Sequence, residues 1–355
     1  MMKKRLTYSI IMFVFVLSCK PQTSWDESYA RGQMLYRQNK YSEALQHASA
    51  SLNAARNFKD VDQYRILQSL YLLASINDKL NKQETADHFY TRSLSIIHTV
   101  KQVDPDQAYS ILRDYSRFLH KQQDLRGALA INAELLEYLK ASKSPIEPYK
   151  LGLLYYDQAL YYTAYEKYES ALTFIKWSVR IFENHYGSGS LRLIDPLYLL
   201  ATLYYHTGDY KLGRQTAELG LKITEDNKGS SNREQARLLM IAAKNIRAQK
   251  AVLTAKNYYE KALLIMDPSA GVYTPELEQI YSGLSELSIL LKEPVKAVSY
   301  QVLAVNTSEA LYGKTNTNTL RQLVKLADLY RQTGDEEKAL RIEYDVRQRL
   351  SSLIN

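Results

Sequence analysis

Residues 197–220 read LYLLATLYYHTGDYKLGRQTAELG and contain the pattern that decides the fold. Leu197, Ala201 and Tyr204 are spaced by three and four residues, which is the period of an amphipathic helix. Gly208 follows, and a glycine after such a segment supplies the left-handed conformation that ends a helix. A second small residue, Gly213, lies in the segment after the turn. The stretch therefore predicts two helices that approach each other closely where their small residues meet.

The same pair of small residues returns through almost the whole chain. The period is 42 residues, with one step of 43, and the two residues of each pair are twelve positions apart. Such phased series are typical of stacked helix pairs. The first series is Gly32, Ala74, Ser116, Ala159, Ala201, Ala243, Ser285 and Ala327, and the second is Ala44, Ala86, Ala128, Ala171, Gly213, Ala255, Ala297 and Ala339. An all-α solenoid of about eight helix-turn-helix repeats is expected over residues 25–355.

The repeat resembles the tetratricopeptide repeat (TPR), whose pattern places a bulky residue, a small one, an aromatic and a turn before alanine in the second helix. The eighth repeat follows it with Leu323, Ala327, Tyr330, Gly334 and Ala339. TPR units usually have 34 residues, so a period of 42 implies longer helices. That length, with the Tyr-Gly pairs at residues 186–187 and 312–313, is similar to the kinesin-light-chain type of array. The resemblance implies a right-handed α-solenoid.

Two proline-containing pairs predict where first helices begin. Thr274-Pro275 and Asp195-Pro196 each resemble an N-cap residue followed by the first helical position, where the missing N–H of proline costs little. Both pairs lie shortly before the small residue of a first helix.

The N-terminus resembles a bacterial lipoprotein signal peptide. A basic start at residues 3–5 precedes an apolar segment over residues 10–17, which ends in Val-Leu-Ser before Cys19, the only cysteine. The resemblance to a lipobox implies cleavage after residue 18, a lipid on Cys19 and a tether over residues 19–24. Lys20 stands where the family's inner-membrane signal has aspartate, which favours the outer membrane of a bacterial envelope. An ordinary cleaved signal peptide with a chance cysteine is the alternative.

Composition argues against several kinds of site. The net charge is +8, and removing Lys3, Lys4 and Arg5 with the signal peptide leaves +5, a mild excess that does not indicate nucleic-acid binding. The six histidines are scattered without metal-ligand spacing. No nucleophile elbow or phosphate-binding loop is present in the sequence. We therefore expect no catalytic residues, no metal and no cofactor.

The TPR resemblance implies that positions three before, and one or four after, each small residue of a first helix face a concave groove. Tyrosine and arginine, which are favoured at binding hot spots, recur at these positions. The predicted partner-binding residues are Tyr29, Tyr71, Arg113, Arg117, Tyr156, Tyr198, Tyr205, Lys244 and Arg247, and Tyr36, His120 and Arg331 are further four-after positions. The chain has 30 tyrosines, however, so this ladder of rings either binds a ligand or only packs between repeats.

Three functions fit these features. The first is a non-catalytic, lipid-anchored scaffold that binds a protein or peptide in the groove, because the fold builds extended binding surfaces. The second is a glycan-binding envelope lipoprotein, since tyrosine-rich surfaces suit sugar rings. The third is the sensor component of a regulatory system. Fold alone does not decide among them.

Overall fold

The computed structural model describes residues 24–57, 62–100, 103–141, 147–227, 231–266 and 271–352. The chain divides into two compact units, one up to Phe118 and one from Leu119, which we treat separately. The predicted signal peptide, the lipidated Cys19 and residues 20–23 of the tether lie outside the described residues. The lipoprotein assignment therefore stays a prediction.

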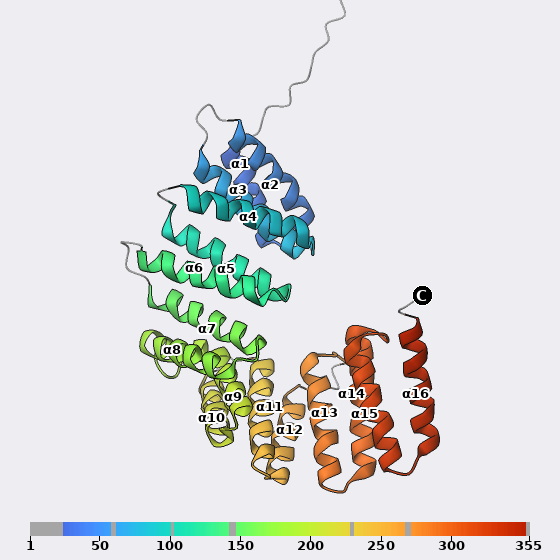
Figure 1. Ribbon diagram of the computed structural model, residues 1–355. Coiled ribbons are helices and arrows are strands. Elements are labelled where there is room, and N and C mark those ends of the chain that lie inside the picture. Colours follow the sequence, from blue (N-terminus) through green and yellow to red (C-terminus); the bar gives the residue numbers. More distant parts are fainter. Residues whose placement is uncertain are drawn as a thin grey trace, which may run out of the picture. The chain divides into compact units, whose positions relative to one another are not determined.

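Both units are built from helix pairs joined by tight turns, and the described residues contain no strand (Figure 1). The first unit contains α1 (Trp25–Arg37), α2 (Tyr41–Arg56), α3 (Gln63–Lys79), α4 (Gln83–Thr99) and most of α5 (Pro105–Lys121). The second contains α6 (Leu125–Ala141), α7 (Pro148–Ala164), α8 (Tyr168–Tyr186), the short 3-10 helix η1 (Leu191–Leu193), α9 (Ile194–Thr207), α10 (Tyr210–Asp226), α11 (Asn232–Ala248), α12 (Val252–Met266), α13 (Pro275–Leu290), α14 (Pro294–Tyr312), α15 (Thr317–Gln332) and α16 (Glu336–Ser351). This arrangement confirms the predicted all-α, TPR-like solenoid fold.

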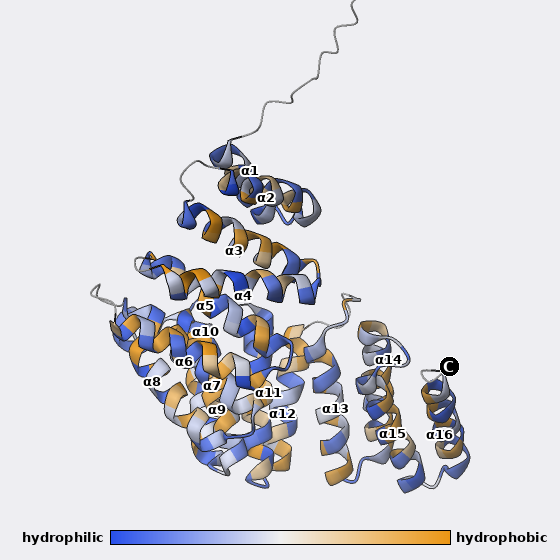
Figure 2. Cartoon of the chain, turned by 45° about the horizontal axis from the view of Figure 1, so that its top comes forward, coloured by the Kyte–Doolittle hydropathy of each residue, from blue (hydrophilic) through white to orange (hydrophobic). Residues whose placement is uncertain are grey.

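Every member of the two small-residue series is buried. A Cβ added to Gly32 would lie 3.3 Å from the backbone nitrogen of Ala48, so the paired helices leave no room for a larger residue there. In the seventh repeat the Ser285 hydroxyl donates to the Ala297 carbonyl oxygen at 2.8 Å, which joins the two series directly. Larger apolar residues fill the space beside these contacts, and the helices carry mixed apolar and polar residues along their length (Figure 2).

The turn inside each repeat contains one residue with a positive φ. These residues have the same 42-residue phase as the small residues: Asn39, Asn81, Gln123, Glu166, Gly208, Lys250, Lys292 and Gly334, with φ between 55° and 86°. Gly208 and Gly334 fulfil the sequence prediction of a left-handed residue. The other six were not anticipated; asparagine tolerates this region at Asn39 and Asn81, but the side chains of Gln123, Glu166, Lys250 and Lys292 disfavour it. The backbone bonds that close the turn therefore impose the conformation.

Side-chain caps start several first helices. Ser231 and Glu234 form a capping box, and Thr274 caps α13 with Pro275 at the first position, as predicted. The prediction that Asp195 is an N-cap is wrong. Ser190 accepts from the Arg192 N–H at 3.2 Å and starts η1, which runs directly into α9, so Asp195 lies inside that helix.

Among the described helices, none is both long and apolar enough to span a bilayer.

The positive-φ turns give the first prediction. Lys292 is exposed and has a φ of 59°. Lys292→Gly should raise the free energy of unfolding by about 0.5–1 kcal/mol. Glycine removes the cost of the left-handed conformation, roughly 1–2 kcal/mol, but part of this gain is lost because glycine has more conformational entropy in the unfolded chain. Gly208→Ala is the matched reverse change. A Cβ there meets nothing within 4 Å, so its expected loss of about 1 kcal/mol comes from the backbone alone. Urea unfolding measures both, and unchanged curves would contradict the backbone argument.

Candidate functional site

The second unit contains a pocket of about 490 Å³ formed mainly by its first helices. Residues of α9, α11, α13 and α15 line it, with one residue each from α12 and α14. Four of the predicted groove residues lie here together: Tyr198, Tyr205, Lys244 and Arg247. The pocket arises because stacked repeats present equivalent positions of successive first helices side by side.

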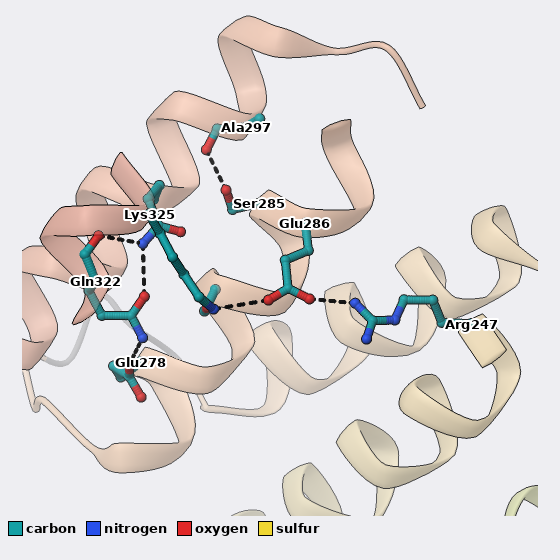
Figure 3. Close-up of polar contacts among 9 residues, drawn as sticks. Arg247, Glu278, Ser285, Glu286, Ala297, Gln322 and Lys325 are labelled. Carbon is teal, nitrogen blue, oxygen red and sulfur yellow. Dashed lines mark hydrogen bonds and ion pairs between the residues drawn. The ribbon is translucent and has the colours of Figure 1, made fainter. Parts of the chain in front are cut away.

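Charged side chains dominate one side of the pocket. Lys244, Arg247, Arg321 and Lys325 line it, against the two carboxylates of Glu278 and Glu286. Glu286 lies between two of the cations: Arg247 donates to one carboxylate oxygen, and Lys325 donates to the other at 3.0 Å (Figure 3). Lys325 also donates to the Ser282 hydroxyl at 3.1 Å. This ion chain joins α11, α13 and α15 and leaves a net positive lining.

The ion chain fixes the protonation of its carboxylate. Burial raises the pKa of Glu286, but the Lys325 ammonium and the Arg247 guanidinium outweigh it and hold the pKa below its usual range. Burial also raises the pKa of the neighbouring Glu278, which the hydrogen bond from Gln322 only partly offsets. Gln322 in turn accepts a hydrogen bond from Gln301 at 2.8 Å, so buried amides position the Glu278 carboxylate (Figure 3).

Lys244 differs from the other cations of the pocket. It is half-buried on α11, and within the described ranges of the chain it has no hydrogen-bond or ion-pair partner. Burial is the main cause that lowers the pKa of its ammonium; Glu286 opposes the shift, and Arg247 and Lys325 add to it. A half-buried cation without a partner destabilises the fold, so its presence in a pocket points to a ligand that supplies the missing anion.

Tyrosine rings also line the pocket. Tyr198 is covered on one face by the Arg237 guanidinium, 4.1 Å from the ring centroid, and Arg237 donates to Asp195 at 3.1 Å. Tyr205 packs against Tyr210 with a centroid separation of 5.9 Å. These rings therefore both pack within the unit and line the pocket, so the two interpretations of the tyrosine ladder are compatible here.

The remaining predicted groove residues lie elsewhere. Tyr29 and Tyr71 line a smaller pocket in the first unit, where the Tyr71 hydroxyl donates to Asp114 at 2.6 Å. Arg113 and Arg117 lie on α5 but are not among the residues that line this pocket. In the second unit, Tyr156 lies on α7, half-buried against the apolar cluster of α7–α9, and is not among the lining residues of the larger pocket.

Sequence reasoning missed the acidic members of both pockets. Glu286 occupies the one-after position of the seventh repeat, beside Ser285, so the rule that selected Lys244 also selects it. Glu278, Gln322 and Lys325 do not occupy the positions, three before and one or four after each small residue, that were predicted to face the groove. Their contribution depends on which side chains of neighbouring repeats meet, and that depends on the stacking of the helices.

The comparisons with known proteins agree with this architecture. The family model described as tetratricopeptide repeat matches residues 67–97, which span α3 and α4 of the second repeat, whereas no curated protein matches the chain. A tetratricopeptide repeat protein from Parabacteroides merdae superposes with a TM-score of 0.60 at 16% identity, over 85% of this chain and 98% of that one. A Rap protein complexed with competence and sporulation factor superposes with a TM-score of 0.54 at 12% identity, over 93% of this chain and 98% of that one.

The kinesin-light-chain likeness also has a structural counterpart. Nearly identical TPR-like repeats of a kinesin light chain from Podospora anserina superpose with a TM-score of 0.50 at 16% identity, over 59% of this chain and 99% of that one. Identities this low establish the fold alone. Residues 67–97 match the model of the tetratricopeptide repeat, and the described helices of the chain have the TPR-like solenoid fold.

The unpartnered cation gives the second prediction. Lys244→Met should raise the free energy of unfolding by about 0.5–1 kcal/mol, because it removes the desolvation cost of a half-buried charge and keeps the volume of the side chain. Lys325→Met is the matched control and should lower it by about 1 kcal/mol, since it breaks the bonds to Glu286 and Ser282. Urea unfolding measures both. A clear loss of stability in Lys244→Met would mean that Lys244 serves the fold.

Proposed function

We propose that this protein is a non-catalytic, lipid-anchored TPR scaffold of the bacterial cell envelope, and that it binds a protein or peptide partner in the pocket between α9 and α15. The fold is typical of interaction scaffolds. The observation that carries the proposal is Lys244, a cation that the described part of the chain leaves without a partner inside a pocket lined by tyrosines.

The chemistry of the pocket indicates what the partner presents. An acidic side chain that enters beside Lys244 supplies the missing counter-charge, with Arg321 exposed nearby at the rim. Glu278 and Glu286 disfavour a ligand that is anionic throughout, so the partner combines isolated acidic residues with apolar or aromatic ones that pack on Tyr198 and Tyr205. The Rap relative, solved with competence and sporulation factor, supports partner binding by this fold.

The envelope location rests on the N-terminal sequence. The resemblance of residues 16–19 to a lipobox supports a lipid on Cys19, and the tether through residue 24 leads directly into α1. Two or three acyl chains anchor a protein firmly, at roughly 0.8 kcal/mol for each buried methylene.

Photo-crosslinking in intact cells tests partner binding. A photo-reactive amino acid in place of Gln279, an exposed residue that lines the pocket, should give one dominant protein adduct, and Lys244→Met in the same chain should reduce its yield about tenfold. The matched control replaces Val295, which is 78% exposed on α14 and lies outside the pocket. The same adducts from both positions, or no protein adduct from folded protein at Gln279, would rule out the pocket as the site.

Metabolic labelling tests the anchor separately. Cells given an alkyne fatty acid should label the full-length chain, and the label should be lost in Cys19→Ser because no other cysteine is available for acylation. Membrane fractionation then reports the location. Label that persists in Cys19→Ser, or none in the wild type, would contradict a lipid on this residue.

A further inference from the structure

A second pocket lies wholly within the first unit, and its tyrosines surround a carboxylate, whereas the lining of the pocket in the second unit is net positive. Its volume is about 240 Å³, and residues of α1, α3 and α5 line it. Three of these are half-buried tyrosines, Tyr29, Tyr36 and Tyr71, and the acidic residue is Asp114. The volume is below the roughly 300–1,000 Å³ of pockets for drug-sized ligands, so the occupant is about as large as one long side chain.

The carboxylate of Asp114 accepts one hydrogen bond within the unit and can accept more. The Tyr71 hydroxyl donates to its Oδ2 at 2.6 Å. Among the residues that the structure describes, Oδ1 has no hydrogen-bond partner, and an ionised carboxylate accepts several bonds. Asp114 can therefore accept a further bond from a donor inside the pocket.

The tyrosines around Asp114 are neutral, and Tyr29 and Tyr71 are held by contacts within the unit. Tyr29 stacks on Trp25 with a centroid separation of 4.8 Å, and its hydroxyl accepts from Gln33 at 2.8 Å. Burial raises the pKa of Tyr29 to about 12. Burial also raises the pKa of Tyr36, and the negative charge of the Asp114 carboxylate raises it further. Neutral aromatic faces attract cations, and ring faces beside a carboxylate form a site that favours an organic cation over an anion.

One cation of the chain itself lines this pocket. Arg37 lies in the last turn of α1 and is exposed, and among the described residues its guanidinium has no hydrogen-bond or ion-pair partner. An exposed arginine exchanges readily with a ligand of the same charge, so removing it should strengthen binding.

We propose that the pocket formed by Tyr29, Tyr36, Tyr71 and Asp114 binds a cationic side chain, an alkylammonium or guanidinium group, presented by a protein partner. The rings contact the cation and its methylenes, and Oδ1 of Asp114 accepts its hydrogen bond. This inference does not depend on the acidic group proposed for the pocket of the second unit.

Proton NMR of small ligands with the full-length chain tests the proposal. Butylammonium is the first probe, because its N–H groups can donate to Asp114, and butan-1-ol is its neutral counterpart. The methylene signals of butylammonium should move upfield in a saturable way, because the ring currents of the tyrosines act on them, and the alcohol should bind at least tenfold more weakly. Equal binding of the two probes would overturn the proposal, since it would show that shape alone is recognised.

Matched variants locate the site. Asp114→Asn should weaken butylammonium binding at least tenfold, and Arg37→Gln should strengthen it by a few-fold. Glu43→Gln removes an exposed acid on α2 outside the pocket and should change nothing. If Asp114→Asn fails to fold, Tyr36→Leu serves in its place, with an expected several-fold loss. Wild-type affinity in a folded variant of either residue would overturn the assignment.

A second pair of probes tests the source of the cation. Nα-acetyl-lysine methylamide should bind at least as tightly as butylamine, and its norleucine analogue should not bind measurably. Tighter binding of the free amine would overturn the assignment to a protein side chain.

Discussion

The close approach of paired helices at small residues is the contact on which the rest of the structure depends. At Gly32 the backbone of one helix lies against the backbone of its partner, and at Ser285 a short hydroxyl side chain bonds directly to the Ala297 carbonyl of the paired helix. This approach fixes the separation of the two helices, and its repetition every 42 residues fixes the separation of successive first helices. Larger side chains at these positions would change both distances, because cores packed to this density do not absorb extra volume.

In each turn inside a repeat, one residue adopts a left-handed conformation, which allows the two helices of the repeat to pair. Six of the eight positive-φ residues in the turns inside the repeats are not glycine, and four of these, Gln123, Glu166, Lys250 and Lys292, have long side chains. Each backbone conformation is set by the bonds that end one helix and start the next, such as that from the Glu293 N–H to the Ser288 carbonyl at 2.8 Å. The stacking of the helices thus overrides the local preference of the turn residue.

The same regular spacing produces two pockets with different chemistry. In the second unit, the chain Arg247–Glu286–Lys325 neutralises most of the buried charge and leaves Lys244 outside it. In the first unit, neutral rings surround the single carboxylate of Asp114. Both pockets use equivalent faces of first helices, so substitutions at a few repeated positions change the recognised charge without altering the fold.

The sequence by itself determined the repeat and its phase, because close helix packing requires small residues at fixed intervals. It also indicated the turns that contain Gly208 and Gly334, but it did not reveal that the start of α9 is set by Ser190. Only the tertiary structure decided which side chains meet. It brought Tyr198, Tyr205, Lys244 and Arg247 into one pocket with Glu286, and it placed Tyr156 against the apolar cluster of α7–α9. The physical reason is that contacts across repeats depend on the stacking of helices far apart in sequence, and a period along one chain does not encode that geometry.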